Sequence, residues 1–454
     1  MSKSIHLREV ALTIAGSDSS AAAGVQGDIK TFSALGVYAC TVITAITAQN
    51  TREITSVTAL DSKVISQQIS CILHDIPPNA IKIGMIHNIS AIKAAANALR
   101  LAKCSIILDP ILYSTSKVRL IEEEAIDSLI STLAPVCHVI TPNIDEAERI
   151  SGQRIKTQED ISKAARSIQK LGARNIIIKG GHSSGKISTD YLLQEDGEAF
   201  RISSQKIQIK DIHGSGCNFS AALTAFIAQK FSLRESFELA NRWSHKSIQN
   251  VSRIGKGWPI TDPLFSIFEN ASRFDILKKT QEAVDYIESI DGLGLLIPET
   301  QSNIVFALKG SERIGDVAGV KGRIVRIGDR ARASSCVQFG SSSHVANAVL
   351  AYNAHNSKFR SAINIKFDHK IKAICHSRFM VSRYDRSNEP PDTRAQEGRT
   401  ILWGVTKALR QKPDADVIYH TGEVGKEAMT LVFGYEPFDV INKLKIILKE
   451  YLLK

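Results

Sequence analysis

The feature that most constrains the fold is an alternation of short apolar strands with amphipathic helices over the first 181 residues. Each strand is a run of small or branched apolar residues, and the helices place apolar residues three or four positions apart. This rhythm predicts an α/β fold, in which a mainly parallel sheet carries helices on both faces. The predicted strands cover residues 10–15, 41–48, 80–85, 105–110, 137–143 and 175–181.

Polar side chains stand where these predicted strands end. In open α/β sheets, ligands bind beyond the carboxyl ends of the parallel strands. The sequence therefore predicts a ligand site along this edge of the sheet. The polar residues at these positions are Ser17, Asp18, Gln49, Asp109, Asn143 and Lys179.

A glycine-rich turn, residues 211–218, leads directly into a long apolar helix. The free backbone amides at such a helix start carry partial positive charge and converge on one spot, which suits a phosphate. The amides of Gly214, Ser215 and Gly216 are the candidates for this anion site. Cys217 follows in the first helical turn, where the same field favours its thiolate. Alternatively, the turn needs glycine only for backbone freedom.

The chain of 454 residues is long enough for two or three domains. The helix–strand rhythm breaks at Trp258-Pro259 and Asp262-Pro263, so we predict domains at residues 1–265 and 266–454. The second half mixes strands with helices and is predicted to be a separate α/β or α+β domain. Its predicted strands are 361–367 and 416–419, and its predicted helices are 344–353 and 399–409.

Charge and cysteine usage narrow the class of protein. The formal net charge of +11 suits nucleic acids, membranes or acidic small molecules. The basic residues are spread along the chain without zinc-finger spacing or a clear helix-turn-helix, so phosphorylated small molecules are the preferred partners, with a solvated basic surface as the alternative. The seven scattered cysteines do not form a disulfide framework. Without a signal peptide or an apolar run of roughly 18 residues, we expect a cytoplasmic protein.

Nine motifs, in order over residues 8–260, resemble the hydroxymethylpyrimidine/phosphomethylpyrimidine kinase family. The resemblance implies a ribokinase-like fold, ATP and Mg²⁺ as cofactors, and phosphorylation of the pyrimidine precursor of thiamine and then of its monophosphate. The motifs are Ala15–Ser20, Gln26–Asp28, Thr47–Thr51, Lys82–Met85, Asp109–Pro110, Ser114–Ser116, Thr141–Asn143 with Glu146, Lys179–His182 and His213–Cys217.

The resemblance also implies roles at the glycine turn and in the substrate pocket. Gly214, Ser215 and Gly216 would form the anion hole for the transferred phosphoryl group. Cys217 would be the base that takes the proton of the substrate hydroxyl; alternatively, it is a small residue packed under the turn. The residues implied to bind the pyrimidine are Gly16, Asp28, Gln49 and Met85.

For the nucleotide, the resemblance implies contacts from Asp109, Asn143 and Lys179. Asp109 and Glu146 would hold Mg²⁺, directly or through water. Alternatively, Glu146 only caps the helix that begins at Asn143, and Lys179 is an ordinary surface lysine.

Motifs in residues 270–454 resemble the archaeal-type thiamine-phosphate synthase domain that occurs fused to this kinase. They include Gly322-Arg323, Phe339–Val345, Tyr384–Arg386 with Glu389-Pro390, and Val417–His420. The resemblance implies coupling of the pyrimidine diphosphate to thiazole phosphate, with release of pyrophosphate. It makes Arg323 and His344 the catalytic candidates, because both would stabilise departing negative charge. Alternatively, Arg323 is a solvated side chain and His344 only caps its helix. Further candidates are Asn364, Asp385, Arg386 and Lys426.

Several positions depart from the kinase pattern. Ala21-Ala22 stands in place of a glycine pair, Lys117 in place of glycine, Gly27 in place of alanine, and Ile212 in place of threonine. These residues lie beside the candidate site residues and leave those intact. We expect them to change loop flexibility more than activity.

Three other functions remain open. The second domain could be a thiamine-phosphate sensor without synthase activity, although no DNA-binding segment accompanies it. The kinase could act on pyridoxal, or the basic chain could bind nucleic acid, which is the least favoured of the three. The expected partners are small-molecule substrates and a second copy of the chain in a homo-oligomer, with neither nucleic acid nor membrane.

Overall fold

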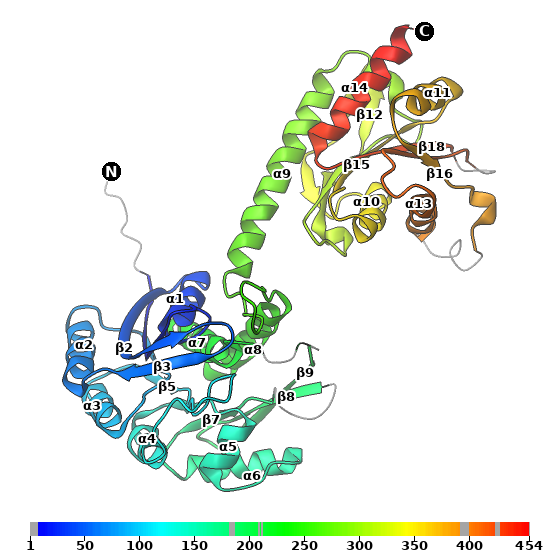
Figure 1. Ribbon diagram of the computed structural model, residues 1–454. Coiled ribbons are helices and arrows are strands. Elements are labelled where there is room, and N and C mark those ends of the chain that lie inside the picture. Colours follow the sequence, from blue (N-terminus) through cyan, green and yellow to red (C-terminus); the bar gives the residue numbers. More distant parts are fainter. Residues whose placement is uncertain are drawn as a thin grey trace, which may run out of the picture. The chain divides into compact units, whose positions relative to one another are not determined.

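The computed structural model describes residues 8–180, 187–207, 209, 212–390, 399–422 and 427–453. The chain divides into two compact units, Met1–Ile267 and Phe268–Lys454. Each unit is built around its own β-sheet (Figure 1). Gly181, His182, Asp211 and Lys426, which the sequence motifs include, lie outside the described residues.

The first unit contains a nine-stranded sheet of order β3-β2-β1-β4-β5-β6-β7-β8-β9. The strands from β2 to β7 in this order are parallel, and β3, β8 and β9 are antiparallel additions at the two edges. The parallel centre confirms the predicted α/β fold. The strands are β1 (Val10–Asp18), β2 (Tyr38–Gln49), β3 (Ile54–Ala59), β4 (Ala80–Ile83), β5 (Ser105–Leu108), β6 (Val139–Ile140), β7 (Asn175–Ile178), β8 (Ile187–Leu193) and β9 (Ala199–Gln205).

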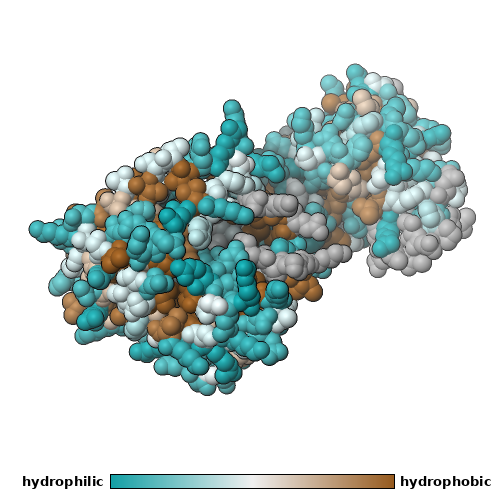
Figure 2. Space-filling view, turned by 60° about the horizontal axis from the view of Figure 1, so that its bottom comes forward, coloured by the Kyte–Doolittle hydropathy of each residue, from teal (hydrophilic) through white to brown (hydrophobic). Residues whose placement is uncertain are grey.

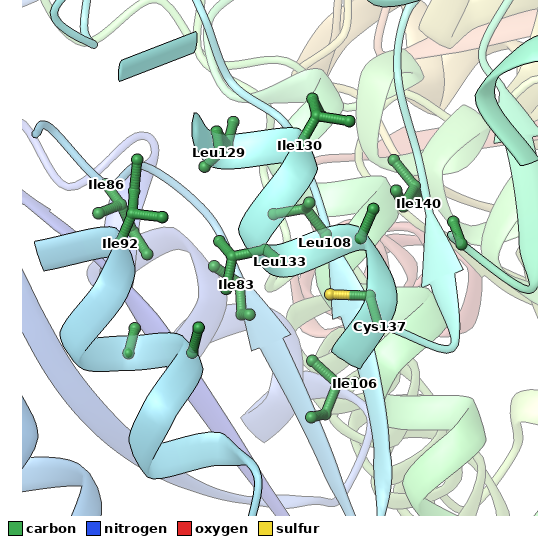
Figure 3. Close-up of a cluster of buried hydrophobic side chains, with 14 of the residues drawn as sticks. Ile83, Ile86, Ile92, Ile106, Leu108, Leu129, Ile130, Leu133, Cys137 and Ile140 are labelled. Atoms are coloured by element: carbon green, nitrogen blue, oxygen red, sulfur yellow. The ribbon is translucent and has the colours of Figure 1, made fainter. Parts of the chain in front are cut away.

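Helices cover both faces of this sheet, because consecutive strand residues are buried on opposite sides. Ile106 and Leu108 of β5 pack against α2–α6, whereas Ile107 packs against α1, α7 and α8. Figure 3 shows the first of these layers, where Ile92 and Leu133 meet the strand residues. The helices are α1 (Gly24–Ala34), α2 (Ser62–Asp75), α3 (Ile89–Leu99), α4 (Ala125–Leu133), α5 (Ile144–Ser151), α6 (Gln158–Gln169), α7 (Ser215–Ala228) and α8 (Leu233–Gln249), with a 3₁₀ turn η1 (Ala134–Val136).

The second unit has a seven-stranded sheet of order β14-β11-β10-β15-β18-β17-β16 and a separate two-stranded hairpin, β12-β13. All its pairs are antiparallel except β16 with β17. The strands are β10 (Ile304–Ala307), β11 (Val317–Val320), β12 (Ile324–Ile327), β13 (Arg330–Ala333), β14 (Val337–Phe339), β15 (Ser361–Lys366), β16 (Val381–Arg383), β17 (Val417–His420) and β18 (Met429–Gly434).

This second sheet is also covered on both faces. Val417 packs with α9, α11 and α14, whereas its neighbour Ile418 packs with α10 and α13. The helices are α9 (Phe265–Ser289), α10 (His344–His355), α11 (His369–Arg378), α13 (Arg399–Gln411) and α14 (Pro437–Leu453), with 3₁₀ turns η2 (Leu293–Leu296), η3 (Ile314–Asp316) and η4 (Arg386–Asn388). The second unit is therefore an α/β domain with a mixed sheet.

The surface shows no dominant apolar face in the view of Figure 2, where apolar residues lie in small groups between polar ones. All seven cysteines are free thiols, which confirms that they do not form a disulfide framework. None of the helices in the described residues combines the length and apolarity that crossing a membrane would require.

Candidate active site

The parallel strands of the first unit bring the predicted site residues to one edge of the sheet. Asp18 and Gln49 are the last residues of β1 and β2. Asp109 follows β5 directly, and Lys179 follows β7. Lys179 pairs with Asn143 in an isolated bridge beyond β6 and β7, so these residues are neighbours.

The glycine turn forms the start of α7, as the sequence predicts. The first intrahelical bond runs from Asn218 N to Gly214 O, at 3.0 Å. The amides of Ser215, Gly216 and Cys217 precede it and have no acceptor within the helix. They form the positive end of a helix of 14 residues, a suitable place for an anion.

Gly214 stands where any side chain would clash with the neighbouring backbone. Its φ is +87°, and a Cβ there would lie 2.2 Å from the carbonyl oxygen of Ala22. The left-handed conformation and the close approach of a second loop both require glycine. The turn at residue 214 is thus fixed against the loop that follows β1.

Lys179 and Asp109 form an ion pair at the same edge. The Nζ of Lys179 lies 2.7 Å from Asp109 Oδ1, and Ser220 Oγ donates to Asp109 Oδ2 at 2.8 Å. A Cβ placed on Gly216 would lie 3.5 Å from the same Nζ. The ammonium group of Lys179 therefore stands beside the free amides of α7, and both attract the same anion.

Cys217 is a thiol here, contrary to the expectation that the helix start favours its thiolate. Burial raises the pKa of Cys217 to about 12, because the charges of Asp109 and Asp28 add to desolvation and outweigh the opposing effect of Lys82 and Lys179. The side chain keeps part of its surface exposed, so it can still meet a substrate. The sequence could not show this balance, since it depends on which charges pack around the sulfur.

Glu146 forms a capping box with Asn143 at the start of α5. Asn143 N donates to Glu146 Oε2, and Glu146 N donates to Asn143 Oδ1, both at 2.8 Å. Glu146 therefore caps α5, whether or not it also contacts a metal ion. Burial raises the pKa of Glu146 to about 7, with Asp109 acting in the same direction and Lys179 against it. The charge of Asp109 therefore acts on the carboxyl group of Glu146.

Gly16 and Met85 are in contact beneath the carboxyl ends of β1 and β4. A Cβ on Gly16 would lie only 2.9 Å from Met85 Sδ. Thr44 donates a 2.6 Å hydrogen bond to the Met85 carbonyl, and Met85 packs with Ala45 and Leu120. These contacts fix Met85 against Gly16 of β1, the strand that pairs with the strand of Gln49.

Gln49 is held by a histidine that the sequence motifs contain but to which we assigned no role. Its Nε2 lies 2.8 Å from His213 Nε2, which also lies 3.3 Å from Asp18 Oδ2. A ring nitrogen carries either a proton or a lone pair, so it cannot serve both the amide NH₂ and the carboxylate. The other ring nitrogen lies 3.3 Å from the hydroxyl of Thr115. His213 thus links Gln49 to the loop that follows β1, through Asp18, and to the loop that contains Thr115.

Asp18 itself organises the loop after β1. It accepts hydrogen bonds from the amides of Ser20, Ala22 and Ala23. Burial raises the pKa of Asp18, but the hydrogen bonds from His213, Ser20 and Ala23 outweigh it and leave the pKa below its usual value. The carboxylate is therefore charged and holds this loop against the glycine turn.

Asp28, which the resemblance assigns to pyrimidine binding, bonds to other side chains of the protein. It is fully buried, and its two oxygens bond to Thr13 at 2.6 Å and to Lys82 at 2.5 Å. Burial raises the pKa of Asp28, and Asp28 in turn raises the pKa of Lys82. We did not single out Lys82 from the sequence, although a charged residue inside an apolar strand is a visible signal.

The departures from the kinase pattern have a structural consequence at two positions. Ala21 and Lys117, which replace glycine, have φ values of +57° and +58°. In this left-handed region a side chain costs roughly 1–2 kcal/mol relative to glycine. At both positions the backbone has a conformation that glycine adopts more easily.

The second unit places its two principal candidates differently. His344 is the first residue of α10, as predicted, and its side chain is exposed. Arg323 is also exposed, directly before β12 of the separate hairpin, where its backbone N donates to Ser334 Oγ.

Two further candidates of the second unit, Asn364 and Asp385, lie in different places. The side chain of Asn364 bonds to the backbone of Asn303 and Gln301, and Asp385 caps η4. Lys426 lies outside the described residues.

A buried polar cluster lies at the ends of β16 and β17 in the second unit. Because these strands are parallel and Arg383 pairs with Tyr419, the residues that follow, Tyr384 and His420, are neighbours. Their rings lie 5.1 Å apart. Burial, together with the charges of Arg386 and His344, lowers the pKa of His420 to about 4. His344 therefore stands close to this cluster.

No group of three or more His, Cys, Asp or Glu residues that could hold a metal ion occurs within the described ranges. Beside Lys179, the first unit instead offers the buried carboxylates of Asp109 and Glu146. Mg²⁺ is commonly bound by one or two carboxylates together with substrate phosphates. The donor set of this site fits such an ion.

Two family models match the chain. The Phosphomethylpyrimidine kinase model matches residues 18–262, and the model of Thiamine-phosphate synthase ThiN matches residues 279–446.

Individual relatives agree with this division. A hydroxymethylpyrimidine/phosphomethylpyrimidine kinase of Rhizobium meliloti is 39% identical over 55% of this chain and 94% of its own. The bifunctional thiamine biosynthesis protein ThiDN of Methanocaldococcus jannaschii is 28% identical over 97% of this chain and 99% of its own. Among solved structures, the Staphylococcus aureus pyridoxal kinase in complex with AMP-PCP and pyridoxal is 31% identical, with a TM-score of 0.53 over 57% of this chain and 94% of that one.

Proposed function

The chain belongs to the phosphomethylpyrimidine kinase family, and on this basis we propose a division of labour between its two units. The first unit is an ATP-dependent kinase that phosphorylates 4-amino-5-hydroxymethyl-2-methylpyrimidine and then its monophosphate. The second unit couples the resulting diphosphate to thiazole phosphate, giving thiamine phosphate and pyrophosphate. The chain thereby performs consecutive steps of thiamine biosynthesis.

The observation that carries the kinase assignment is the convergence of Lys179 and the free amides of α7 on one spot. Phosphoryl transfer depends mainly on positioning and on neutralising charge. The amides of Ser215, Gly216 and Cys217 would bind the travelling phosphoryl group, and Lys179 would stabilise its charge. The pocket of Gly16, Met85 and Gln49 would orient the pyrimidine, with its hydroxymethyl group toward Cys217.

Cys217 would act as the base of the first step. In its thiolate form, Cys217 takes the proton of the substrate hydroxyl, the hydroxyl oxygen bonds to the γ-phosphorus, and the bond from that phosphorus to the ADP oxygen breaks. In the second step the nucleophile is a phosphate oxygen that is already ionised, so no base is needed. The two steps should therefore depend on Cys217 to different degrees.

Mg²⁺ would be held at Asp109 and Glu146, partly through water, and would supply positive charge to the nucleotide phosphates. Asp109 is held in place by Lys179 and Ser220, and Asn143 fixes Glu146 through the capping box. These contacts orient the carboxylates before a ligand arrives. Burial raises the pKa of Glu146 and the charge of Asp109 adds to it, so a cation nearby would stabilise both carboxylates.

In the second unit, His344 and the start of α10 would receive the pyrophosphate group. A helix of 12 residues offers free amides at its N-terminus, and His344 is its first residue. The exposed Arg323 would grip phosphate oxygens from the hairpin β12-β13. Stabilising the departing charge is the main requirement of this reaction, because the leaving group takes the bonding electrons with it.

One reaction tests the whole proposal. The purified chain is given hydroxymethylpyrimidine, ATP, Mg²⁺ and thiazole phosphate, and thiamine phosphate is measured. Pyridoxal in place of the pyrimidine tests the alternative that the likeness to pyridoxal kinases raises, and we expect a much lower rate with it. Pyrimidine diphosphate that accumulates without thiamine phosphate would support a sensing second unit instead of a synthase.

A further inference from the structure

The buried cluster in the second unit contains polar atoms that the described protein leaves without hydrogen bonds. These atoms are the hydroxyl of Tyr384 and both carboxylate oxygens of Glu389. Tyr384 is 3% exposed and Glu389 is 5% exposed. Leaving buried polar groups unbonded is costly, and a carboxylate is the costliest of them. A site with this pattern is built for a ligand that completes it.

Within the part of the chain that the structure describes, Glu389 faces the guanidinium of Arg386 in the preceding turn, η4. Arg386 Nη2 lies 3.7 Å from Glu389 Oε2, beyond hydrogen-bond distance. The guanidinium compensates part of the negative charge, but it does not occupy the lone pairs of the carboxylate. A second anion is therefore disfavoured at this position, whereas an N–H donor is favoured.

The neighbouring groups define the ligand further. His420 is neutral because its pKa is lowered to about 4, and its Nδ1 accepts a hydrogen bond from Gly422 N at 3.2 Å. Its proton is then on Nε2, which is a donor. Tyr384 contacts the ring of Trp403 at 6.2 Å in a T-shaped arrangement. Aromatic walls with mixed donors and acceptors suit a flat, neutral heterocycle with an amino group.

The geometry points to Glu389, together with the hydroxyl of Tyr384, as the subsite that binds the amino edge of the pyrimidine ring during coupling. This inference rests on the proposed synthase function of the second unit. The amino group would donate to the Glu389 carboxylate, and a ring nitrogen would accept from Tyr384 or His420. The substrate thereby supplies the hydrogen bonds that the protein lacks.

The same contact would help the reaction. The bond between the pyrimidine methylene carbon and the diphosphate oxygen breaks, and its electron pair leaves with pyrophosphate. The thiazole nitrogen then forms the new bond with its lone pair, and no proton is released. Positive charge develops on the methylene carbon and spreads into the aminopyrimidine, so an adjacent carboxylate stabilises the transition state. Glu389 is then a catalytic residue, while His344 faces the leaving group.

The test is Glu389→Gln in the full chain, assayed with preformed pyrimidine-methyl diphosphate, thiazole phosphate and Mg²⁺. The substitution keeps the size of the side chain and removes its charge. We expect kcat/KM for coupling to fall by about 10²-fold or more. The matched control is Glu282→Gln, which removes an exposed carboxylate on α9 of the same unit; coupling should stay at the wild-type rate.

Specificity separates a binding role from a structural one. The coupling rate is compared for the 4-amino substrate and an analogue without the amino group. A site that is built for an N–H donor strongly rejects an analogue without that donor. The wild-type coupling rate should therefore be about 10²-fold or more higher with the 4-amino substrate than with the analogue. Glu389→Gln should reduce that discrimination by about 10-fold or more, because its amide is a weaker acceptor than a carboxylate.

Each outcome decides a different point. If wild type does not couple the preformed substrates, the proposed synthase function fails, and this inference fails with it. If wild type couples and Glu389→Gln lowers the rate without changing the discrimination, Glu389 is structural and only this inference fails. Should Glu389→Gln not fold, Tyr384→Phe replaces it, since that variant keeps the ring packed against Gly404 and Trp403; unchanged discrimination in Tyr384→Phe would also overturn the inference.

Discussion

In the first unit the charged side chains of the site are bonded to one another, whereas in the second unit buried polar atoms have no partner within the described residues. Lys179 is paired with Asp109, Lys82 with Asp28, and Glu146 with the start of α5. In the second unit, both oxygens of Glu389 and the hydroxyl of Tyr384 are without hydrogen bonds.

The difference indicates two ways of preparing a site. The first unit uses backbone amides for its ligand and fixes its charged side chains beforehand, so it can receive a charged group without large rearrangement. The second unit relies on side chains whose hydrogen bonds would come from the ligand, so ligand binding should stabilise it strongly. Five variants of the first unit probe this comparison.

The largest effect should come from Gly214→Ala. The added methyl group meets the carbonyl of Ala22, and φ of +87° is unfavourable for alanine, so the amides of α7 must move. We expect both kinase steps to slow by about 10³-fold, since misplaced donors lose most of their effect. Coupling of preformed pyrimidine diphosphate serves as the control and should be unchanged; a parallel fall would show that the two sites are not separate.

Cys217→Ala should separate the two kinase steps. Loss of a general base lowers a rate by about 10²- to 10⁴-fold, so phosphorylation of the hydroxymethyl group should fall by at least 10²-fold. Phosphorylation of the monophosphate should fall by less than about 10-fold, because its nucleophile is already ionised. The two rates are measured by separating the monophosphate and diphosphate products. If both rates fell equally, Cys217 would not be the base of the first step.

The pH dependence of the first step should follow from the same residue. Because the pKa of Cys217 is raised to about 12, the thiolate fraction grows with pH throughout the neutral range. In wild type, kcat/KM of the first step should rise by up to about tenfold per pH unit from pH 7 to pH 9. The second step should lack this rise, and a flat profile in both steps would contradict a thiol base.

A smaller effect is expected from Glu146→Gln, which keeps the capping box and removes a buried charge. The pKa of Glu146 is raised from 4.5 to about 7 in the folded protein, so the folded state holds its proton more tightly than the unfolded chain. Its contribution to stability is complete below pH 4.5 and is lost as the pH rises to about 7. Wild type should lose up to about 3 kcal/mol across this window, and the variant should not.

Chemical denaturation at several pH values would measure this difference. The free energy of unfolding is compared between wild type and Glu146→Gln at each pH, so that other titrating groups cancel. A difference that does not change between pH 4.5 and 7 would mean that Glu146 keeps its ordinary pKa in the folded protein.

The smallest effect is expected from Ala21→Gly and Lys117→Gly. Both residues have positive φ, where glycine avoids the cost of a side chain. Glycine also gains freedom in the unfolded chain, so we expect a net stabilisation of only about 0.5–1 kcal/mol for each variant. Thermal unfolding measures it, and a destabilised variant would show that the loops are held by contacts of the side chains.

The sequence predicts the parallel centre of the first sheet because the signals are local. Gln49, Asp109 and Lys179 each follow an apolar strand, and His344 stands before a helical pattern, so their places at strand ends or helix starts can be predicted. The second sheet was predicted less completely, because its short antiparallel strands lack a repeating unit.

Contacts between distant segments could not be predicted from the sequence. The link from His213 to Gln49 joins residues 164 positions apart, and Tyr384 meets His420 only because β16 and β17 are parallel. The raised pKa of Cys217 likewise depends on the packing of four charged residues around it. Such features follow from strand register and packing, which no local pattern specifies.

The close approach of Gly214 to the carbonyl of Ala22 has an evolutionary consequence. Two segments about 190 positions apart share a space with no room for one more carbon atom. Neither loop can drift alone: a relative with a bulkier residue at 214 should carry a compensating deletion or rerouting after β1. Substitutions at residue 214 and in the loop after β1 should then occur together among relatives, because the two segments share one confined space.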